Sequence, residues 1–395
     1  MFNLQSSMNY NHPNKNSSTV AIRLMCAIVF LTFSFVWLYC FQADILAAAQ
    51  HVLSKGLTTY KPFVGAMLIT LALQVFQLIV YALTRLRKRS HALTYLPSML
   101  TLAVITDINS DIDSHYALSS WWVILLVFVL WGLLVLGARA FQTIEPDAEP
   151  KGLFSRAMWI NMLTMALLII GVVALSNSNA VFHYRMRAEA RLLSGDYEGA
   201  LQMGAKSLES DADLQMIRMY ALSRTGELGE RLFAYPVSGH SEAMLPVEGK
   251  SKFVMYPTDS LYRFLGARPK GEMTTARYLE LMQRRDSVND LHIADYQLCG
   301  LLIDKHIDDF VRQLRHYYTE GDTLVIDRLP KHYREAMTLY THLRSHPVVI
   351  YHNSVMDEDW KNLQELEAQY PDLTERKGKV EEQYRGTYWY YYEYE

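Results

Sequence analysis

The sequence predicts an all-α protein in two parts. The first is a bundle of about five transmembrane helices over residues 1–178, and the second is an extracytoplasmic α-solenoid of helical repeats over residues 179–395. Charge distribution supports this division, because residues 1–178 contain 11 Lys or Arg and 7 Asp or Glu, whereas residues 179–395 contain 27 and 34. The first part consists of long uncharged stretches, and the second has the apolar periodicity of amphipathic helices. The net charge of -3 therefore averages a basic part and an acidic part.

Five stretches are candidates for membrane spans, because a helix needs roughly 20 mostly apolar residues to cross a bilayer core of about 30 Å. They lie near residues 24–41, 63–83, 93–108, 118–137 and 157–175. The stretch 93–108 is shorter and contains Pro97 and Asp107, so a re-entrant or interfacial segment is the alternative there. Residues 47–49 (Ala-Ala-Ala) are typical of a signal-peptidase site, but the preceding apolar run is longer than that of a signal peptide, which favours an uncleaved helix.

Basic residues predict the orientation of the bundle, because Lys and Arg collect in cytoplasmic loops. A cytoplasmic N-terminus leaves only Lys55 and Lys61 outside. The basic residues that it places inside are Lys15, Arg23, Arg85, Arg87, Lys88, Arg89, Arg139, Lys151 and Arg156. Five spans then put the second part on the extracytoplasmic side of the membrane.

The predicted spans hold few polar side chains. Gln74, Gln77 and Asn161 suit hydrogen bonds between helices, and no ionisable residue lies in the middle of a span. Ion and proton pathways need such residues, so a pump or proton-coupled transporter is disfavoured. We expect the bundle to contact lipid as an anchor, and the sequence leaves open that it forms a homo-oligomer.

A repeat signature follows the last span. Gly195 and Tyr197, with the small Ala200 after them, are typical of the turn inside a tetratricopeptide repeat. A weaker copy has Gly226 at a spacing of 31 residues, close to the repeat period of about 34, but Arg231 stands at the place of the small residue.

Four more helices are predicted downstream by apolar stripes at helical spacing. The stripes are Leu291, Ala294, Leu298 and Leu301; Ile307, Phe310, Val311, Leu314 and Tyr318; Tyr333, Ala336, Met337, Tyr340 and Leu343; and Trp360, Leu363 and Leu366. Pro330 suits the first turn of the third helix, and Asp357 is a plausible cap for the fourth. The Pro-rich stretch 234–270 is predicted to be mostly loop and to divide the repeat region.

Aromatic residues crowd the C-terminus. The cluster comprises Tyr384, Tyr388, Trp389, Tyr390, Tyr391 and Tyr392, together with Tyr394. Such side chains bury a large area and keep a polar tip. Two interpretations stay open: the tail caps its own solenoid, which we favour, or it docks to a partner protein or to the outer leaflet.

Other patterns for chemistry are incomplete. Residues 107–113 have the oxygen spacing that opens a calcium loop, but Ile112 and Leu118 replace the required Gly and acid. His342 and His346 lie one helical turn apart without further zinc ligands, and His332, His342 and His352 are expected on solvated surfaces. The chain contains no nucleophile elbow or phosphate-binding loop, and Cys26, Cys40 and Cys299 form no metal or disulfide pattern. We therefore predict no metal, no cofactor, no nucleic-acid partner and no catalytic residue.

Four motifs follow the apolar stretches in a fixed order, at residues 195–201, 302–305, 329–336 and 386–391. Together they resemble a family of uncharacterised bacterial inner-membrane proteins with a tetratricopeptide-like C-terminal region, most strongly from about residue 290 onward. Because that family has no assigned activity, the resemblance implies an architecture and a location and no site residue.

The leading functional hypothesis is a membrane-anchored scaffold that presents a helical-repeat surface to an extracytoplasmic protein. The alternative is a membrane glycosyltransferase or ligase acting on lipid-linked sugars. Such an enzyme generally needs a carboxylate at the outer mouth of the early spans, for which Asp44 is the candidate.

Overall fold

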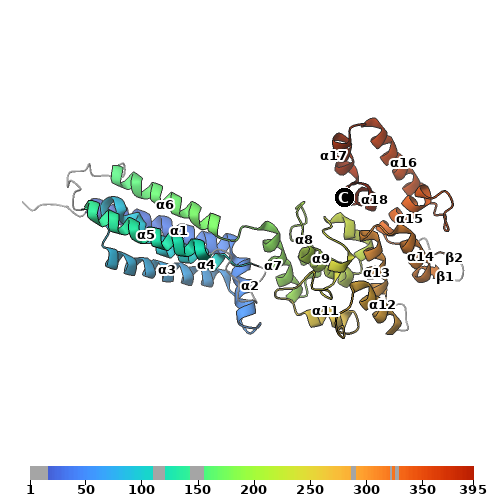
Figure 1. The fold of residues 1–395 in the computed structure, drawn as a ribbon, viewed down its shortest axis with the longest axis horizontal. Coiled ribbons are helices and arrows are strands. Elements are labelled where there is room, and N and C mark those ends of the chain that lie inside the picture. Colours follow the sequence, from blue (N-terminus) through green and yellow to red (C-terminus); the bar gives the residue numbers. More distant parts are fainter. Residues whose placement is uncertain (1–16, 110–120, 143–154, 286–290, 321–322, 325–328) are drawn as a thin grey trace, which may run out of the picture. The chain divides into compact units, whose positions relative to one another are not determined.

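The computed structural model describes residues 17–109, 121–142, 155–285, 291–320, 323–324 and 329–395. The chain divides into two compact units, Met1–Asn179 and Ala180–Glu395. Figure 1 shows both to be helical, with the first in blue to green and the second in green to red. Among the described residues, the strands are limited to the two-residue antiparallel pair β1 (Thr319–Glu320) and β2 (Thr323–Leu324). The predicted all-α class is confirmed.

Long apolar helices build the first unit. They are α1 (Ser17–Val36) with its π-helical continuation η1 (Trp37–Phe41), α2 (Ala43–Leu53), α3 (Pro62–Thr84), the 3-10 helix η2 (Lys88–Tyr95), α4 (Leu96–Thr106), α5 (Trp121–Gln142) and α6 (Arg156–Leu175). Within the described residues, three helices are long and apolar enough to cross a membrane: Val20–Phe41, Pro62–Thr84 and Arg156–Leu175. A shorter apolar stretch, Leu125–Phe141, lies within α5.

The predicted span 93–108 has an unexpected form. Its α-helix, α4, has only 11 residues, and η2 precedes it directly. The backbone N–H of Ala92 in η2 donates to Oδ1 of Asn161 near the start of α6, at 2.7 Å. At the other end, the hydroxyls of Thr106 and Ser176 lie 2.7 Å apart, just after α6. The pair η2–α4 therefore follows α6 along most of its length.

Contacts between helix ends fix the directions of the other helices. Arg23 in α1 hydrogen-bonds the hydroxyl of Tyr81 near the end of α3. Nε of Arg139, near the end of α5, donates to the carbonyl of Thr84 at 3.0 Å. Consequently α1, η2–α4 and α6 run in one direction and α3 and α5 in the other, with Arg23, Arg85, Arg139 and Arg156 at the same end of the bundle.

Polar contacts in this unit lie inside, within an apolar core, and many large apolar side chains also lie outside. Nε2 of Gln77 donates to the hydroxyl of Thr94 at 2.8 Å, so the predicted hydrogen bonding between helices is confirmed for Gln77 and for Asn161. Leu68 on α3 and Leu167 on α6 are among the many large apolar residues left exposed. An apolar outer surface of this extent marks an interaction surface and is not the surface of an ordinary soluble unit.

The second unit is a succession of short helices around one hydrophobic core. They are α7 (Ala180–Leu193), α8 (Tyr197–Gln202), α9 (Ala212–Thr225), α10 (Leu228–Arg231), η3 (Leu232–Ala234), η4 (Ser241–Met244), α11 (Thr258–Phe264), α12 (Thr275–Arg285), α13 (Leu291–Ile303), α14 (Ile307–Tyr317), α15 (Lys331–Leu343), α16 (Ser354–Gln369), α17 (Leu373–Tyr384) and α18 (Tyr388–Tyr394). Side chains from α7 to α18 join in the same buried cluster.

The four downstream helices lie close to their predicted positions, as α13, α14, α15 and α16. The residues of the predicted stripes are mostly buried, although Leu343 is 41% exposed. The predicted cap of the last helix is wrong: α16 begins at Ser354, and the side chain of Asn353 accepts from the backbone N–H groups of Val355 and Met356. Asn353 is the better cap because it precedes the helix, whereas Asp357 lies in its first turn.

The Pro-rich stretch 234–270 contains η4 and α11, and the rest of it lacks regular structure. Its Met244 and Leu261 belong to the same buried cluster as the helices before and after it. The carboxylate of Glu189 in α7, which is fully buried, accepts three backbone N–H groups at residues 254–256, at 2.6 to 3.1 Å. This carboxylate fixes a stretch that has few backbone hydrogen bonds of its own.

Candidate functional site

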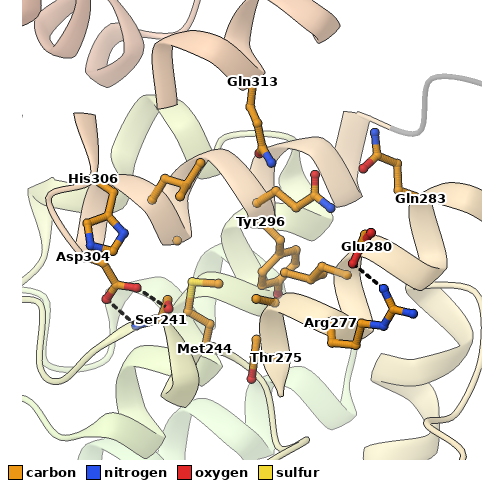
Figure 2. Close-up of a pocket in the computed structure, with 15 residues that line it drawn as sticks. Ser241, Met244, Thr275, Arg277, Glu280, Gln283, Tyr296, Asp304, His306 and Gln313 are labelled. Atoms are coloured by element: carbon orange, nitrogen blue, oxygen red, sulfur yellow. Dashed lines mark hydrogen bonds and ion pairs between the residues drawn. The ribbon is translucent and has the colours of Figure 1, made fainter. Parts of the chain in front are cut away.

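An open pocket of about 500 Å³ is the candidate binding site of the second unit. Helices α12, α13 and α14 and the short η4 provide its walls, and Figure 2 shows the lining side chains arranged around Tyr296. The apolar part of the lining includes Met244, Leu279 and Leu301. Small-molecule and peptide sites commonly have volumes of about 300–1,000 Å³ and combine an apolar lining with a few polar groups. The pocket therefore has the size and the composition of a binding site.

Charged groups of both signs surround the pocket, and each has a partner within the protein. The carboxylate of Asp304 accepts from the backbone N–H of Ser241 at 3.0 Å and from its hydroxyl, but keeps its negative charge because serine is neutral. Arg277 and Glu280 form an ion pair at 2.7 Å, and this pair and the Asp304–Ser241 contact are drawn in Figure 2. The hydrogen bond from Arg277 keeps the pKa of the Glu280 carboxyl below its usual value. Since Arg284 also pairs with Glu280, the two arginines and the two carboxylates together carry no net charge.

Side-chain amides supply the remaining polarity. Gln283 comes from α12, Gln297 from α13 and Gln313 from α14, and all three line the pocket. The carbonyl oxygen of Gln297 accepts from the hydroxyl of Tyr317, so its amide nitrogen remains as a donor. Gln283 and Gln313 make no side-chain hydrogen bond to the residues that the structure describes, and Gln313 is exposed. Two complete amides and one amide nitrogen are thus available to a ligand.

A second polar cluster lies on the same helix, α13, and is occupied by the protein itself. Oδ1 of Asp295 accepts from the hydroxyl of Tyr333 at 2.8 Å and from that of Tyr318 at 3.4 Å. Burial raises the pKa of the Asp295 carboxyl to about 6. Sγ of Cys299 lies 3.5 Å from the same Tyr333 hydroxyl, and burial raises the pKa of this thiol far above its usual value. A thiol held in its protonated form is a poor nucleophile, so the cluster is structural.

The C-terminal aromatic cluster packs against the unit's own helices. Tyr388, Trp389, Tyr390 and Tyr391 of α18 are buried, whereas Tyr384 and Tyr392 are half-buried. The indole N–H of Trp389 donates to the carbonyl of Glu335 in α15 at 2.7 Å, and the hydroxyl of Tyr391 donates to the carbonyl of Ile303 at the end of α13 at 2.7 Å. The tail therefore lies in the core of its own unit.

Two motifs from the sequence, at residues 329–336 and 386–391, meet in one buried network. The carboxylate of Glu335 accepts from the backbone N–H of Tyr388 at 2.7 Å and lies 2.8 Å from Nδ1 of His332. Nζ of Lys331 donates to the carbonyl of Gly386 at 3.1 Å. The contacts join the start of α15 to the start of α18, which explains why both motifs stand out in the sequence.

The prediction that His332 lies on a solvated surface is wrong. Its side chain is 1% exposed, and Nε2 accepts from the backbone N–H of Phe233 at 3.2 Å. This acceptor role puts the proton on Nδ1, where it can be donated to Glu335. A charged residue three positions after a histidine is typical of exposed helix faces, so the sequence held no signal for this burial, which depends on Phe233 and Tyr388 from other helices. His342 and His352 are exposed, and the ring of His342 stacks on that of Trp360.

The predicted repeat positions lie at two successive turns. Gly195 has φ of +74° between α7 and α8, where the carboxylate of Asp196 caps α8 by accepting from Gly199 N–H at 2.8 Å. Tyr197 begins α8 and Ala200 is 1% exposed within it. Gly226 has φ of +75° and ends α9. A left-handed conformation at both glycines is the reason why glycine occupies them.

The remaining candidates, Asp44 and the incomplete calcium loop, belong to the first unit. Asp44 lies half-buried in the first turn of α2, in the first unit, and accepts from the N–H of Ile45 at 2.9 Å. The incomplete calcium loop at 107–113 falls partly outside the described residues. Within the described part of the chain, no group of three His, Cys, Asp or Glu side chains is placed to hold a metal ion, and the three cysteines are free.

Sequence reasoning missed the pocket and the Asp295 cluster. Asp295 and Gln297 interrupt the apolar run of α13, and this interruption was the only signal for either feature. Gln283 and Gln313 lie at ordinary surface positions of their own helices. Only the packing of α12, α13 and α14 brings the three amides to the same pocket.

Residues 275–395 match the model of a family of unknown function (DUF6057). The matched range includes α12 to α18, the greater part of the pocket lining and the two motifs that meet around Glu335. Comparison with curated proteins and with solved structures gave no match. This part of the chain is thus similar to an uncharacterised domain.

Proposed function

We propose that this protein is a membrane-anchored scaffold, which holds a tetratricopeptide-like helical unit on the extracytoplasmic side of a bacterial inner membrane and presents it to a partner protein. The observation that carries the proposal is the alternating direction of the helices in the first unit, with Arg23, Arg85, Arg139 and Arg156 at one end. Basic residues at one end of an apolar bundle mark the cytoplasmic end.

Five spans are supported by the path of η2–α4, which follows α6 along most of its length. Its apolar part, from Leu93 to Thr106, extends roughly 22 Å, from rises of about 2.0 and 1.5 Å per residue, and the polar residues before Leu93 continue it toward the basic end of the bundle. The helix α5, with 22 residues, provides the remaining passage. An odd number of passages puts the start of the chain and the second unit on opposite sides.

The scaffold role is supported by the character of the second unit. Glycines with positive φ separate its first short helices, as in helical repeats. The charged groups of its pocket have partners within the protein, and its side-chain amides are available to a ligand. The carboxylate of Asp295 and the thiol of Cys299, on the same helix, both contact the hydroxyl of Tyr333. This combination suits recognition by shape and hydrogen bonding, and we expect no covalent chemistry there.

Reporter fusions test the topology. Alkaline phosphatase fused after Glu395 should be active, and green fluorescent protein at the same position should be dark. Fusions after Arg87, in the basic loop that follows α3, form the matched control and should give the opposite pattern. A fluorescent, phosphatase-negative fusion at Glu395 contradicts the proposed compartment.

Cross-linking in native membranes tests the scaffold role. A photoreactive residue placed at the exposed Leu208 or Leu373 of the second unit should yield specific protein adducts. The same residue at the buried Phe310 is the control. If no adduct forms from any exposed position, the protein is not a scaffold under those conditions and the proposal fails.

A further inference from the structure

We propose that the pocket between η4, α12, α13 and α14 binds an extended, uncharged peptide segment of the partner protein. The inference rests on the proposed scaffold function and names the site and the chemistry of docking. Its first support is the origin of the three amides, because Gln283, Gln297 and Gln313 come from three successive helices and line one pocket. Amides on successive helices can follow a ligand that extends across them.

Peptide backbone suits these amides. Each peptide unit offers one N–H donor and one carbonyl acceptor, and a side-chain amide offers the complementary pair. Gln283 and Gln313 have both groups available, and Gln297 has its amide nitrogen available because Tyr317 occupies the carbonyl oxygen. An extended segment leaves its backbone groups unpaired, so it gains from these contacts, whereas a helix already satisfies its own.

The charges of the pocket favour an uncharged segment. Glu280 is paired with Arg277 and with Arg284, and Asp304 accepts hydrogen bonds from the neutral Ser241, so the four charged groups sum to no net charge. A phosphate or an acidic peptide would face the Asp304 carboxylate, and a strongly basic peptide would have to displace Ser241 or the two arginines. The apolar lining at Met244, Leu279 and Leu301 accommodates small or aliphatic side chains of the bound segment.

A neutral sugar is the competing ligand class, and the aromatic content of the pocket disfavours it. Sugar sites commonly offer an exposed aromatic face to the apolar side of the ring. Tyr296 is the only aromatic residue in the pocket lining, which lies wholly within the described part of the chain, and it is fully buried. No aromatic platform is therefore available, and peptide is the better match.

Selection from a displayed library of random eight-residue peptides tests the proposal, with the full-length protein in lipid nanodiscs as the target. We expect the enriched peptides to lack charged residues. The double variant Gln283→Ala and Gln313→Ala should weaken their binding by about tenfold or more, since each hydrogen bond contributes a factor of several. The matched control is Gln364→Ala, an exposed glutamine on α16 outside the pocket, which should bind as the parent does.

Several outcomes overturn the proposal. These are enrichment of charged peptides, failure to enrich any peptide, equal binding by the double variant, and binding of neutral oligosaccharides that depends on Gln283 and Gln313. The integrity of the double variant is checked by the protection of Cys299 from thiol reagents, because this cysteine is buried in the second unit. If protection is lost, the single variant Gln313→Ala, at an exposed position, replaces it and should weaken binding severalfold.

Failure of this inference is distinct from failure of the scaffold. Protein adducts from Leu208 or Leu373, together with loss of the peptide result, leave the scaffold standing and place docking outside the pocket. Absence of adducts from every exposed position removes the scaffold itself, whatever the peptide selection returns.

Discussion

Replacing Trp389 by Ala should strongly destabilise the second unit. The side chain is 2% exposed and contacts the rings of Trp360 and Tyr384, and its indole N–H donates to the carbonyl of Glu335. A buried tryptophan removes about 150–250 Å² from water, which corresponds to about 4–6 kcal/mol at about 25 cal/mol per Å². Measured losses for Trp→Ala in cores are about 3–5 kcal/mol. We therefore expect the free energy of unfolding to fall by about 4 kcal/mol.

A change of this size is readily measured. In domains of about 150–250 residues, 1 kcal/mol shifts the melting temperature by about 2–4 °C, so the expected fall is roughly 10 °C. Pulse labelling with N-ethylmaleimide at rising temperature reports on the second unit specifically, because Cys299 is buried there and mass spectrometry identifies its peptide. The control is Leu373→Ala, which truncates a side chain that is 67% exposed and should change the melting temperature by less than 2 °C.

The result also decides the role of the C-terminal aromatic cluster. If the melting temperature of Trp389→Ala equals that of the parent protein, α18 does not stabilise its own unit. The cap interpretation would then be wrong, and the aromatic residues would serve a partner. A fall near 10 °C, with the control unchanged, establishes that the tail is part of the core.

Three further predictions concern the same unit. Burial raises the pKa of the Asp295 carboxyl from 3.8 to about 6, so the folded state binds this proton more tightly than the unfolded state. The free energy of unfolding should therefore fall by about 3 kcal/mol as the pH rises from about 4 to above 6. Asp295→Asn should abolish that part of the fall in urea unfolding followed by circular dichroism, and an unchanged pH profile would contradict the burial of the charge. Gly229→Ala should lower the free energy of unfolding by about 1–3 kcal/mol, since a Cβ there would lie 2.7 Å from Cζ of the buried Tyr333 ring. If the variant is as stable as the parent protein, α10 and α15 are less closely packed than in this structure. Glu189→Gln should cost about 1–3 kcal/mol and open residues 254–256 to proteolysis, because it weakens the hydrogen bonds that three backbone N–H groups donate to this buried side chain. Protection equal to that of the parent protein would exclude this role.

Much of the fold was predictable from local patterns. Apolar length alone located α1, α3 and α6, because a bilayer demands about 20 apolar residues in one run. The apolar stripes located α13 to α16, since a helix that buries one face repeats its apolar residues every three or four positions. Both signals are written in consecutive residues and need no knowledge of the partner surface.

Local patterns were less informative for residues 88–106, where a 3-10 helix leads directly into an α-helix. The 3-10 helix η2 begins in polar residues and has a larger rise per residue than an α-helix, so apolar length alone does not describe this element. Oδ1 of Asn161 in α6 accepts from the backbone N–H of Ala92 in η2, and the hydroxyls of Thr106 and Ser176 meet at the other end. A contact with a helix some 70 residues away cannot be seen in the sequence of the stretch itself.

By itself, the sequence determined the helical class, the position of the long apolar helices and the chemical kind of the C-terminal cluster. These properties depend on composition and on periodicity along one segment. Tertiary structure alone decided that His332 and Glu335 are buried beside Tyr388, that Asp295 faces two tyrosine hydroxyls, and that three glutamines line one pocket. Each of these arrangements joins residues from different helices, and their burial and pairing are set by which helix faces meet when the unit packs.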